Sequence, residues 1–257
     1  MNHSIGDQRI YKFRADISAI DIPEKLNNPF DSYIPEIARV AAKEFQEAIQ
    51  AESAEWEHDF SVDNGKMFGI LVVQRKDKTY GYLRGVSGTL PGKATGEHMV
   101  PSIFDDSADD YFIHKGMIVL TEMTDTIKGL TDEEEIAVLK EKRKEKSFAL
   151  QQQLFSHYRF SNQRGEVKNV VEIFRNSSHG NPPSAAGDCA APKLLQYAFE
   201  HRLKPIAIAE FWWGNPPKNK ERKQGEYYPA CKNKCRPILE YMLDDKRLFD
   251  QGIQSFL

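Results

Sequence analysis

The three cysteines restrict the fold of this 257-residue chain more than any other feature. Cys189 precedes residues 194–199, whose apolar side chains recur at helical spacing, and Cys231 and Cys235 precede a similar pattern over residues 238–243. A buried strand is predicted between the two patterns, in the apolar run PIAIAEFWW. If the cysteines act together, the fold must bring two helix starts side by side.

Zinc is the partner that best suits these residues. It prefers thiolate and imidazole ligands, and the spacing of Cys231 and Cys235 at a helix start lets both sulfurs reach one ion. Cys189 also stands at a helix start, where backbone N–H groups and the helix dipole favour a thiolate. The sequence therefore predicts a zinc site formed by Cys189, Cys231 and Cys235. Two alternatives stay open, namely unliganded thiols and a nucleophilic Cys189.

The composition indicates the cellular compartment of the protein better than it indicates its function. A chain of this length buries a core without metal or disulfides, and its formal net charge of -3 names no partner. The N-terminal residues lack a signal-peptide pattern, and no window approaches the roughly 18 apolar residues of a membrane span. We expect a cytoplasmic protein that does not enter a membrane and whose cysteines stay reduced.

The residue patterns predict a mixed α/β (α+β) fold in three segments. Residues 1–124 are expected to form an N-terminal α+β region, with a helix near Ile37–Ile49 and a β-hairpin formed by Met67–Val73 and Thr79–Val86. The other two segments are a long helix and the cysteine-containing αβα module.

Residues 125–157 are expected to form a long charged connecting helix. Thr131 is its expected N-cap, and Glu134 completes a capping box. Its charge runs are typical of a solvated face, but a protein-interaction or RNA-facing role stays open. Residues 158–257 form the third segment, which opens with a short hairpin or a strand that leads into a helix.

A local excess of positive charge indicates a nucleic-acid surface. Between Lys218 and Arg236 there are seven Lys or Arg and two Glu, with aromatic residues on both sides. The candidate phosphate contacts are Lys218, Lys220, Arg222, Lys223, Lys232, Lys234 and Arg236, and the candidate stacking residues are Trp212, Trp213, Tyr227 and Tyr228. Core packing is the alternative role for the tandem tryptophans.

Part of this pattern resembles the zinc-dependent cytidine deaminase-like fold. The order GDCAAPKLL, PIAIAEFWWG and PACKNKC is similar to the core of that family, which implies zinc ligation by Cys189, Cys231 and Cys235. The family has a Glu two residues after its first ligand, where this chain has Ala191, and its cysteine pair is usually C-x2-C rather than C-x3-C. A deaminase would therefore need Asp188, His179 or Glu210 for proton transfer. His179 is also a candidate fourth ligand, and Asp188 a candidate helix N-cap.

A second resemblance spans nearly the whole chain. The segments GKMFGILVV, YGYLRGVSGTL, MVPSIFD, GDCAAPKLLQYAFEHRLKPIAIAEFWWG and YYPACKNKCRPILEYML are similar to the N-terminal region that precedes the catalytic domain in a bacterial subgroup of RluA-type pseudouridine synthases. The catalytic HRLD-type motif of those enzymes has no match, because His201-Arg202-Leu203 is followed by Lys204.

This second resemblance implies a zinc-binding, RNA-associated accessory protein in RNA modification, either stand-alone or a fragment of a longer synthase. Its expected partners are RNA or a nucleotide and an RluA-type synthase domain. A zinc-dependent nucleoside or base deaminase and a protein-interaction module are the alternatives.

Overall fold

The computed structural model describes residues 9–53, 56, 58–61, 65–90, 98–104, 111–175, 177, 180–217 and 221–244. Its helices and strands confirm the predicted mixed α/β (α+β) class. In chain order they are α1 (Glu36–Glu52), β1 (Lys66–Gln74), β2 (Tyr80–Val86), α4 (Tyr111–Gly129), α5 (Glu133–His157), β3 (Arg159–Ser161), β4 (Val167–Asn169), α6 (Val170–Arg175), α7 (Ala190–Glu200), β5 (Lys204–Trp213) and α8 (Arg236–Leu243).

The central sheet is antiparallel and has the strand order β2-β1-β5. Its middle strand, β1, is buried over most of its length, which explains the unbroken apolar run in its sequence. Because β1 and β2 come from the first expected segment and β5 from the third, these two segments share one sheet. The boundary expected near residue 124 therefore does not separate two independent cores.

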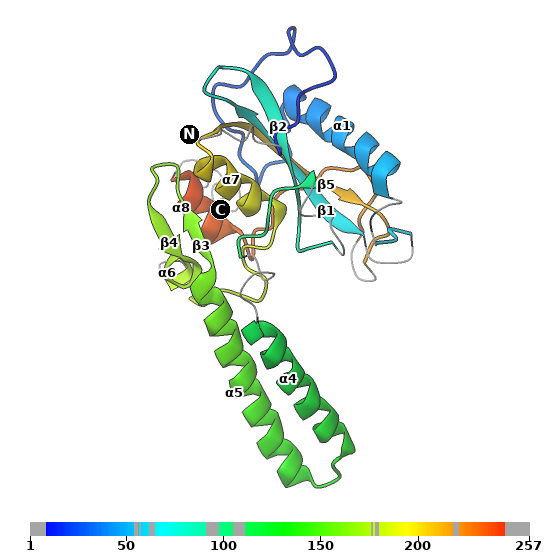
Figure 1. Ribbon diagram of the computed structural model, residues 1–257, viewed down its shortest axis with the longest axis vertical. Helices are drawn as coiled ribbons and strands as arrows, with labels where there is room; N and C mark the ends of the chain where they lie inside the picture. The colour runs from blue at the N-terminus through cyan, green and yellow to red at the C-terminus, as the bar shows by residue number, and fades with distance from the viewer. Residues whose placement is uncertain are drawn as a thin grey trace, which may run out of the picture.

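Helices cover both faces of this sheet (Figure 1). On one face, α1 buries Phe45 against Phe68 of β1 and Phe211 of β5, with ring centroids 5.5 and 5.8 Å apart. On the other face lies α7, and α8 packs against α7. Two apolar clusters follow from this arrangement, one beneath α1 and one beneath α7. The sheet thus lies between two helical layers.

A pair of glycines allows α7 to approach the sheet closely. Gly69 of β1 lies opposite Gly85 of β2 and also opposite Glu210 of β5. A Cβ atom at Gly69 would lie 2.9 Å from the Cβ of Ala190, the first residue of α7. Because Cys189 immediately precedes Ala190, this close approach also determines how deeply the Cys189 thiol is buried.

The charged helix is half of a helical hairpin that projects from the sheet (Figure 1). The sequence did not predict α4, which packs along α5. Gly116 accommodates Leu150 between the helices, and Arg143 Nε donates to Thr124 Oγ1 at 2.7 Å. The expected N-cap was wrong by one residue, because Asp132 rather than Thr131 accepts the hydrogen bond that caps α5.

The third segment opens as the sequence predicted. Strands β3 and β4 form a short hairpin, and β4 continues directly into α6. Helix α8 packs against both α6 and α7, and all three helices contact the hairpin. No helix among the described residues combines the length and apolar character needed to cross a lipid bilayer.

Candidate metal centre and adjoining cavity

The two helix starts that carry the cysteines lie together. Cys189 is the N-cap residue of α7 and Cys235 is the N-cap residue of α8. Cys231 lies one turn before Cys235, and the backbone N–H of Cys235 donates to the carbonyl of Cys231 at 3.2 Å. The structure therefore brings together all three cysteines that the sequence singled out.

Hydrogen bonds join the three side chains into one cluster. The sulfur of Cys231 accepts from the thiols of Cys189 and Cys235 and from the backbone N–H groups of Lys234 and Asn233, which lowers the pKa of Cys231 far below its usual value. The pKa of Cys189 is raised because its thiol donates to Cys231. The hydrogen bonds with Cys189 and Cys231, together with burial, raise the pKa of Cys235. Within this thiol cluster the contacts favour the thiolate form at Cys231 over Cys189.

The donor set of the thiol cluster fits a zinc ion. Zn–S bonds of about 2.3 Å in a tetrahedron place the sulfurs about 3.8 Å apart, close to the separation at which thiols exchange hydrogen bonds. N–H groups that point at Cys231 stabilise a thiolate. Within the described ranges, no three His, Cys, Asp or Glu side chains are already arranged to hold a metal ion. Zinc binding would therefore replace the shared protons and readjust the side chains of the cluster.

A buried carboxyl group lies beside the thiol cluster. Glu210 is 6% exposed and comes from the middle of β5. Burial raises the pKa of Glu210 to about 7. A hydrogen bond from the backbone N–H of Ala191 lowers this pKa, and the nearby Cys231 raises it. The Ala191 N–H donates to Glu210 Oε1 at 3.1 Å. Glu210 thus places a carboxyl group next to residue 191, which is itself an alanine.

A buried lysine also faces this region. Lys193 of α7 is 1% exposed, and its Nζ donates to the carbonyl of Gly88 at 2.7 Å. Burial lowers the pKa of Lys193 to about 8, and the negative charge of Asp188 opposes that shift. A lysine in this position offsets part of the negative charge that three thiolates would bring.

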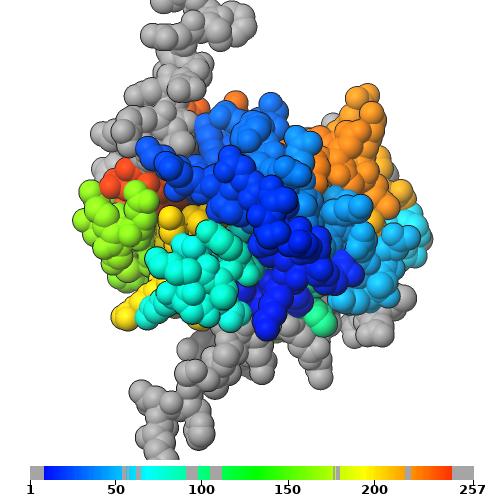
Figure 2. All heavy atoms as spheres, turned by 90° about the horizontal axis from the view of Figure 1, so that it is seen from above, coloured from blue at the N-terminus to red at the C-terminus, as the bar shows by residue number. Residues whose placement is uncertain are grey.

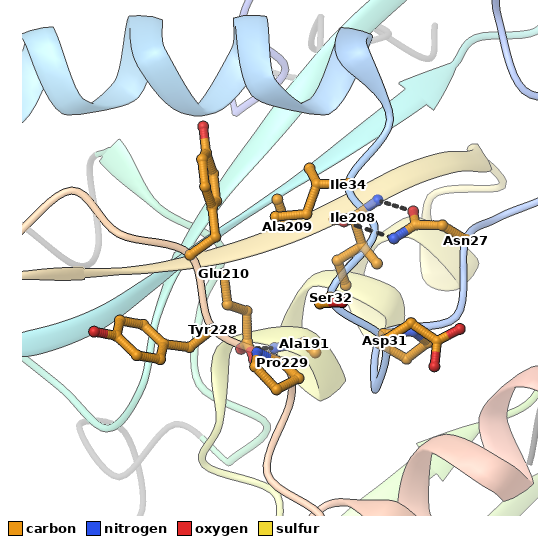
Figure 3. A pocket seen from close by; sticks show the side chains of 12 residues that line it. Asn27, Asp31, Ser32, Ile34, Ala191, Ile208, Ala209, Glu210, Tyr228 and Pro229 are labelled. Atoms are coloured by element: carbon orange, nitrogen blue, oxygen red, sulfur yellow. Dashed lines mark hydrogen bonds between the residues drawn. The ribbon is translucent and has the colours of Figure 1, made fainter. Parts of the chain in front are cut away.

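A cavity of about 60 Å³ adjoins Glu210 at the edge of β5 (Figure 3). Glu210, Ala191 and Pro229 lie close together in its lining, and Asn27 and Asp31 lie apart from them. Asn27 holds the N-terminal segment against β5, because its amide exchanges two hydrogen bonds with the backbone of Ile208. The cavity has room for a few water molecules next to the carboxyl group.

The structure assigns Asp188 a different place from Glu210. Its carboxylate accepts a hydrogen bond from Tyr158 Oη at 2.7 Å, and it does not line the cavity. Asp188 is not the N-cap of α7, because Cys189 occupies that position. His179, the other residue considered for proton transfer or zinc ligation, lies outside the described residues.

The aromatic candidates divide between core and surface. Trp212 is 8% exposed and its Nε1 donates to the carbonyl of Gly214, so its predicted role as a stacking surface is wrong. Trp213 is half-buried at the end of β5. Tyr227 and Tyr228 are also half-buried, and both line the cavity.

The basic candidates are partly exposed. Arg222 is half-buried and its guanidinium lies 4.0 Å from the ring centroid of Tyr228. Lys223 and Lys232 are exposed, Lys234 is half-buried, and Arg236 pairs with Glu240 at 2.8 Å. Lys218 and Lys220 lie outside the described residues.

One signal in the sequence points to Glu210, because it is a single acid in the apolar run of β5. The sequence contains no such signal for Asn27, which reaches β5 from far away in the chain. No family model, curated protein or solved structure matches this chain.

Proposed function

We propose that this protein is a zinc-binding, RNA-associated accessory protein, related to the N-terminal region of RluA-type pseudouridine synthases. The observation that carries the zinc assignment is the convergence of Cys189, Cys231 and Cys235 at two adjoining helix starts. Zinc would hold α7, α8 and the segment between β5 and α8 in a fixed arrangement.

The RNA association is supported by residue chemistry. Arg222, Lys223 and Lys232 place positive charge on the segment that connects β5 to the second helix start. Phosphate groups attract such charge, and the association would weaken steeply as the salt concentration rises. The similarity to the synthase region, stated above from its sequence segments, supports an RNA rather than another polyanion.

Metal content tests the zinc part of the proposal. The wild-type protein should contain about one zinc per chain, and Cys231→Ser should lose it, because a hydroxyl is a poor substitute for a thiolate ligand. Lys232→Ala is the matched control, since it changes the neighbouring exposed residue and should retain zinc. A wild-type protein without zinc, or a Cys231→Ser variant that keeps it, would defeat the assignment.

A zinc-dependent hydrolase of the deaminase type is the second candidate function. The observation that favours it is the position of Glu210, whose carboxyl group lies beside the thiol cluster, contacts Ala191 and lines a cavity. A bound zinc ion would supply Lewis acidity and lower the pKa of water. Glu210 would accept a proton from that water and deliver it to the leaving amino group, a role that typically contributes about 10²–10⁴-fold to the rate.

Ammonia release from nucleosides and free bases tests the second candidate. Glu210→Gln should retain zinc and lose activity, whereas Asp188→Asn should retain both, because Asp188 does not line the cavity. If zinc-loaded wild-type protein releases no ammonia from any nucleoside or base, the hydrolase function is excluded and only the accessory function remains.

A further inference from the structure

A groove of about 710 Å³ opens at the end of β5. Its lining comes from the end of α1, from residues 56 and 58–61, and from the last residue of β5 and the segment after it. In Figure 2 the orange residues that follow β5 rise beside the light-blue residues that precede β1. The groove is distinct from the cavity at Glu210, and its volume falls in the range of sites that take small molecules or single bases.

Aromatic side chains contribute much of its lining. Trp56 and Phe60 are buried, with ring centroids 6.3 Å apart, and the His58 ring lies 4.6 Å from that of Phe60. Trp213 is only half-buried and lines the groove at the strand end. A flat ring that is partly exposed in a groove is a surface on which another planar group can stack.

Backbone hydrogen bonds hold the two sides of the groove together. The N–H of Asn215 donates to the carbonyl of Phe60 at 2.9 Å, and that of Gly65 donates to the carbonyl of Asn215 at 2.8 Å. On the other side, Gly225 donates to the carbonyl of Trp212 at 2.7 Å and accepts from Gln46 Nε2 at 3.2 Å. These bonds tie residues on either side of Trp213 to the rest of the fold.

The polar lining suits the edge of a nucleobase. Gln50, Asn215 and Gln224 line the groove, and an amide has both donor and acceptor groups. Gln224 Oε1 already accepts from the N–H of Gly214, and Asn215 Nδ2 donates to the carbonyl of Ser61, so each of these two amides can present its other polar group to a ligand. Base edges present the same two kinds of group, and recognition of unpaired bases in RNA combines such hydrogen bonds with aromatic stacking.

Two lysines lie next to lining residues, although no Lys or Arg among the described residues lines the groove itself. Their charge favours a ligand with phosphates over a neutral one. Lys66 lies directly opposite Trp213 in the sheet register, and Lys223 is the exposed neighbour of Gln224. The groove lining contains one acid, Asp59, whose carboxylate accepts hydrogen bonds from the N–H and hydroxyl of Ser61. Positive charge beside an exposed aromatic ring is typical of sites for single-stranded nucleic acid.

We propose that this groove binds an unpaired base of single-stranded RNA, with the base stacked on Trp213 and its phosphates directed toward Lys66 and Lys223. The inference rests on the RNA association proposed above and adds the binding site and the form of the RNA. It does not depend on the zinc site.

Fluorescence provides a direct probe. The chain contains three tryptophans, of which Trp56 and Trp213 line the groove and Trp212 adjoins it. A short oligouridylate should therefore quench the intrinsic fluorescence, and the anisotropy of a labelled oligouridylate should report the affinity. Trp213→Ala should weaken binding roughly tenfold or more, whereas Trp213→Phe should preserve most of it. Phe148→Ala, which removes an exposed aromatic residue from α5, should leave binding unchanged.

Trp213 packs against the cluster beneath α1, so a loss of binding in Trp213→Ala could come from unfolding. A second variant separates the two causes. Gln224→Ala changes an exposed residue of the same groove and should also weaken binding. All these variants should keep the zinc content of the wild type.

The outcomes separate the proposals. Wild-type affinity in folded Trp213→Ala and in Gln224→Ala would overturn the groove and leave RNA association by the other basic residues intact. Quenching by a neutral oligosaccharide but not by oligouridylate would overturn the groove as an RNA site. Unchanged anisotropy of the labelled oligouridylate would overturn the RNA association as well. None of these results bears on the zinc assignment.

Discussion

Replacing Glu210 by Gln tests whether the structure describes the surroundings of this carboxyl group correctly. Burial raises the pKa of Glu210 to about 7 from an ordinary value of 4.5. Glutamine has nearly the same shape, carries no charge at any pH, and keeps an oxygen that can accept the hydrogen bond from Ala191. The substitution therefore removes the ionisable group and preserves the side-chain shape and the hydrogen-bond acceptor.

The sign and size of the effect follow from the two pKa values. A group whose pKa is higher in the folded state contributes stability that is fully present below the unfolded pKa and is lost as the pH rises through the folded one. The difference of about 2.5 units corresponds to about 3 kcal/mol of the free energy of unfolding, lost between about pH 4.5 and pH 7. In Glu210→Gln this loss should be absent, so the variant should be more stable than the wild type at about pH 8.

Urea unfolding of both proteins provides the measurement, with a chelator present so that bound metal does not contribute. The difference between the two free energies matters, because every other titrating group is common to both proteins. Parallel pH profiles for the wild type and Glu210→Gln would refute the burial of an ionisable group at this position. A variant that is less stable at every pH would show that the carboxylate has a favourable partner in the folded protein.

Two further predictions concern packing and capping. Gly69→Ala should destabilise the protein by about 1–3 kcal/mol in urea unfolding, because the new methyl group would meet Ala190; Gly85→Ala should cost less, since it meets only the side chain of Leu194, and equal costs would contradict the argument. Asp132→Ala should destabilise the start of α5 by about 1 kcal/mol, which amide hydrogen exchange over the first turn of that helix would detect, and unchanged exchange would count against the cap.

Local patterns predicted much of the fold. Apolar periodicity gave the helices at Cys189 and Cys235, and the near-continuous apolar run gave β1. The pattern did not give α4, because an apolar stretch such as MIVL in Met117–Leu120 fits a strand as well as a helix. Thr131 and Asp132 are both good N-caps, so sequence alone could not choose between them.

The candidate site was predictable only in part, because contacts distant in the sequence form its surroundings. The side of the sheet on which Glu210 lies depends on the register with β1, where Glu210 stands opposite Gly69. The cavity depends on Asn27, whose partner Ile208 is far away in the chain. Neither pairing leaves a pattern in the local sequence.

The segment from Gln224 to Pro229 is the structural link between the two regions for which we propose ligands. It runs along the edge of β5, where Trp212 donates to the carbonyl of Glu226 and Tyr228 donates to the carbonyl of Glu210, both at 3.0 Å. Gln224 at one end lines the groove, and Pro229 at the other lines the cavity, two residues before Cys231. Because the same backbone bonds hold both ends, a metal ion that fixes Cys231 would also restrain the groove wall.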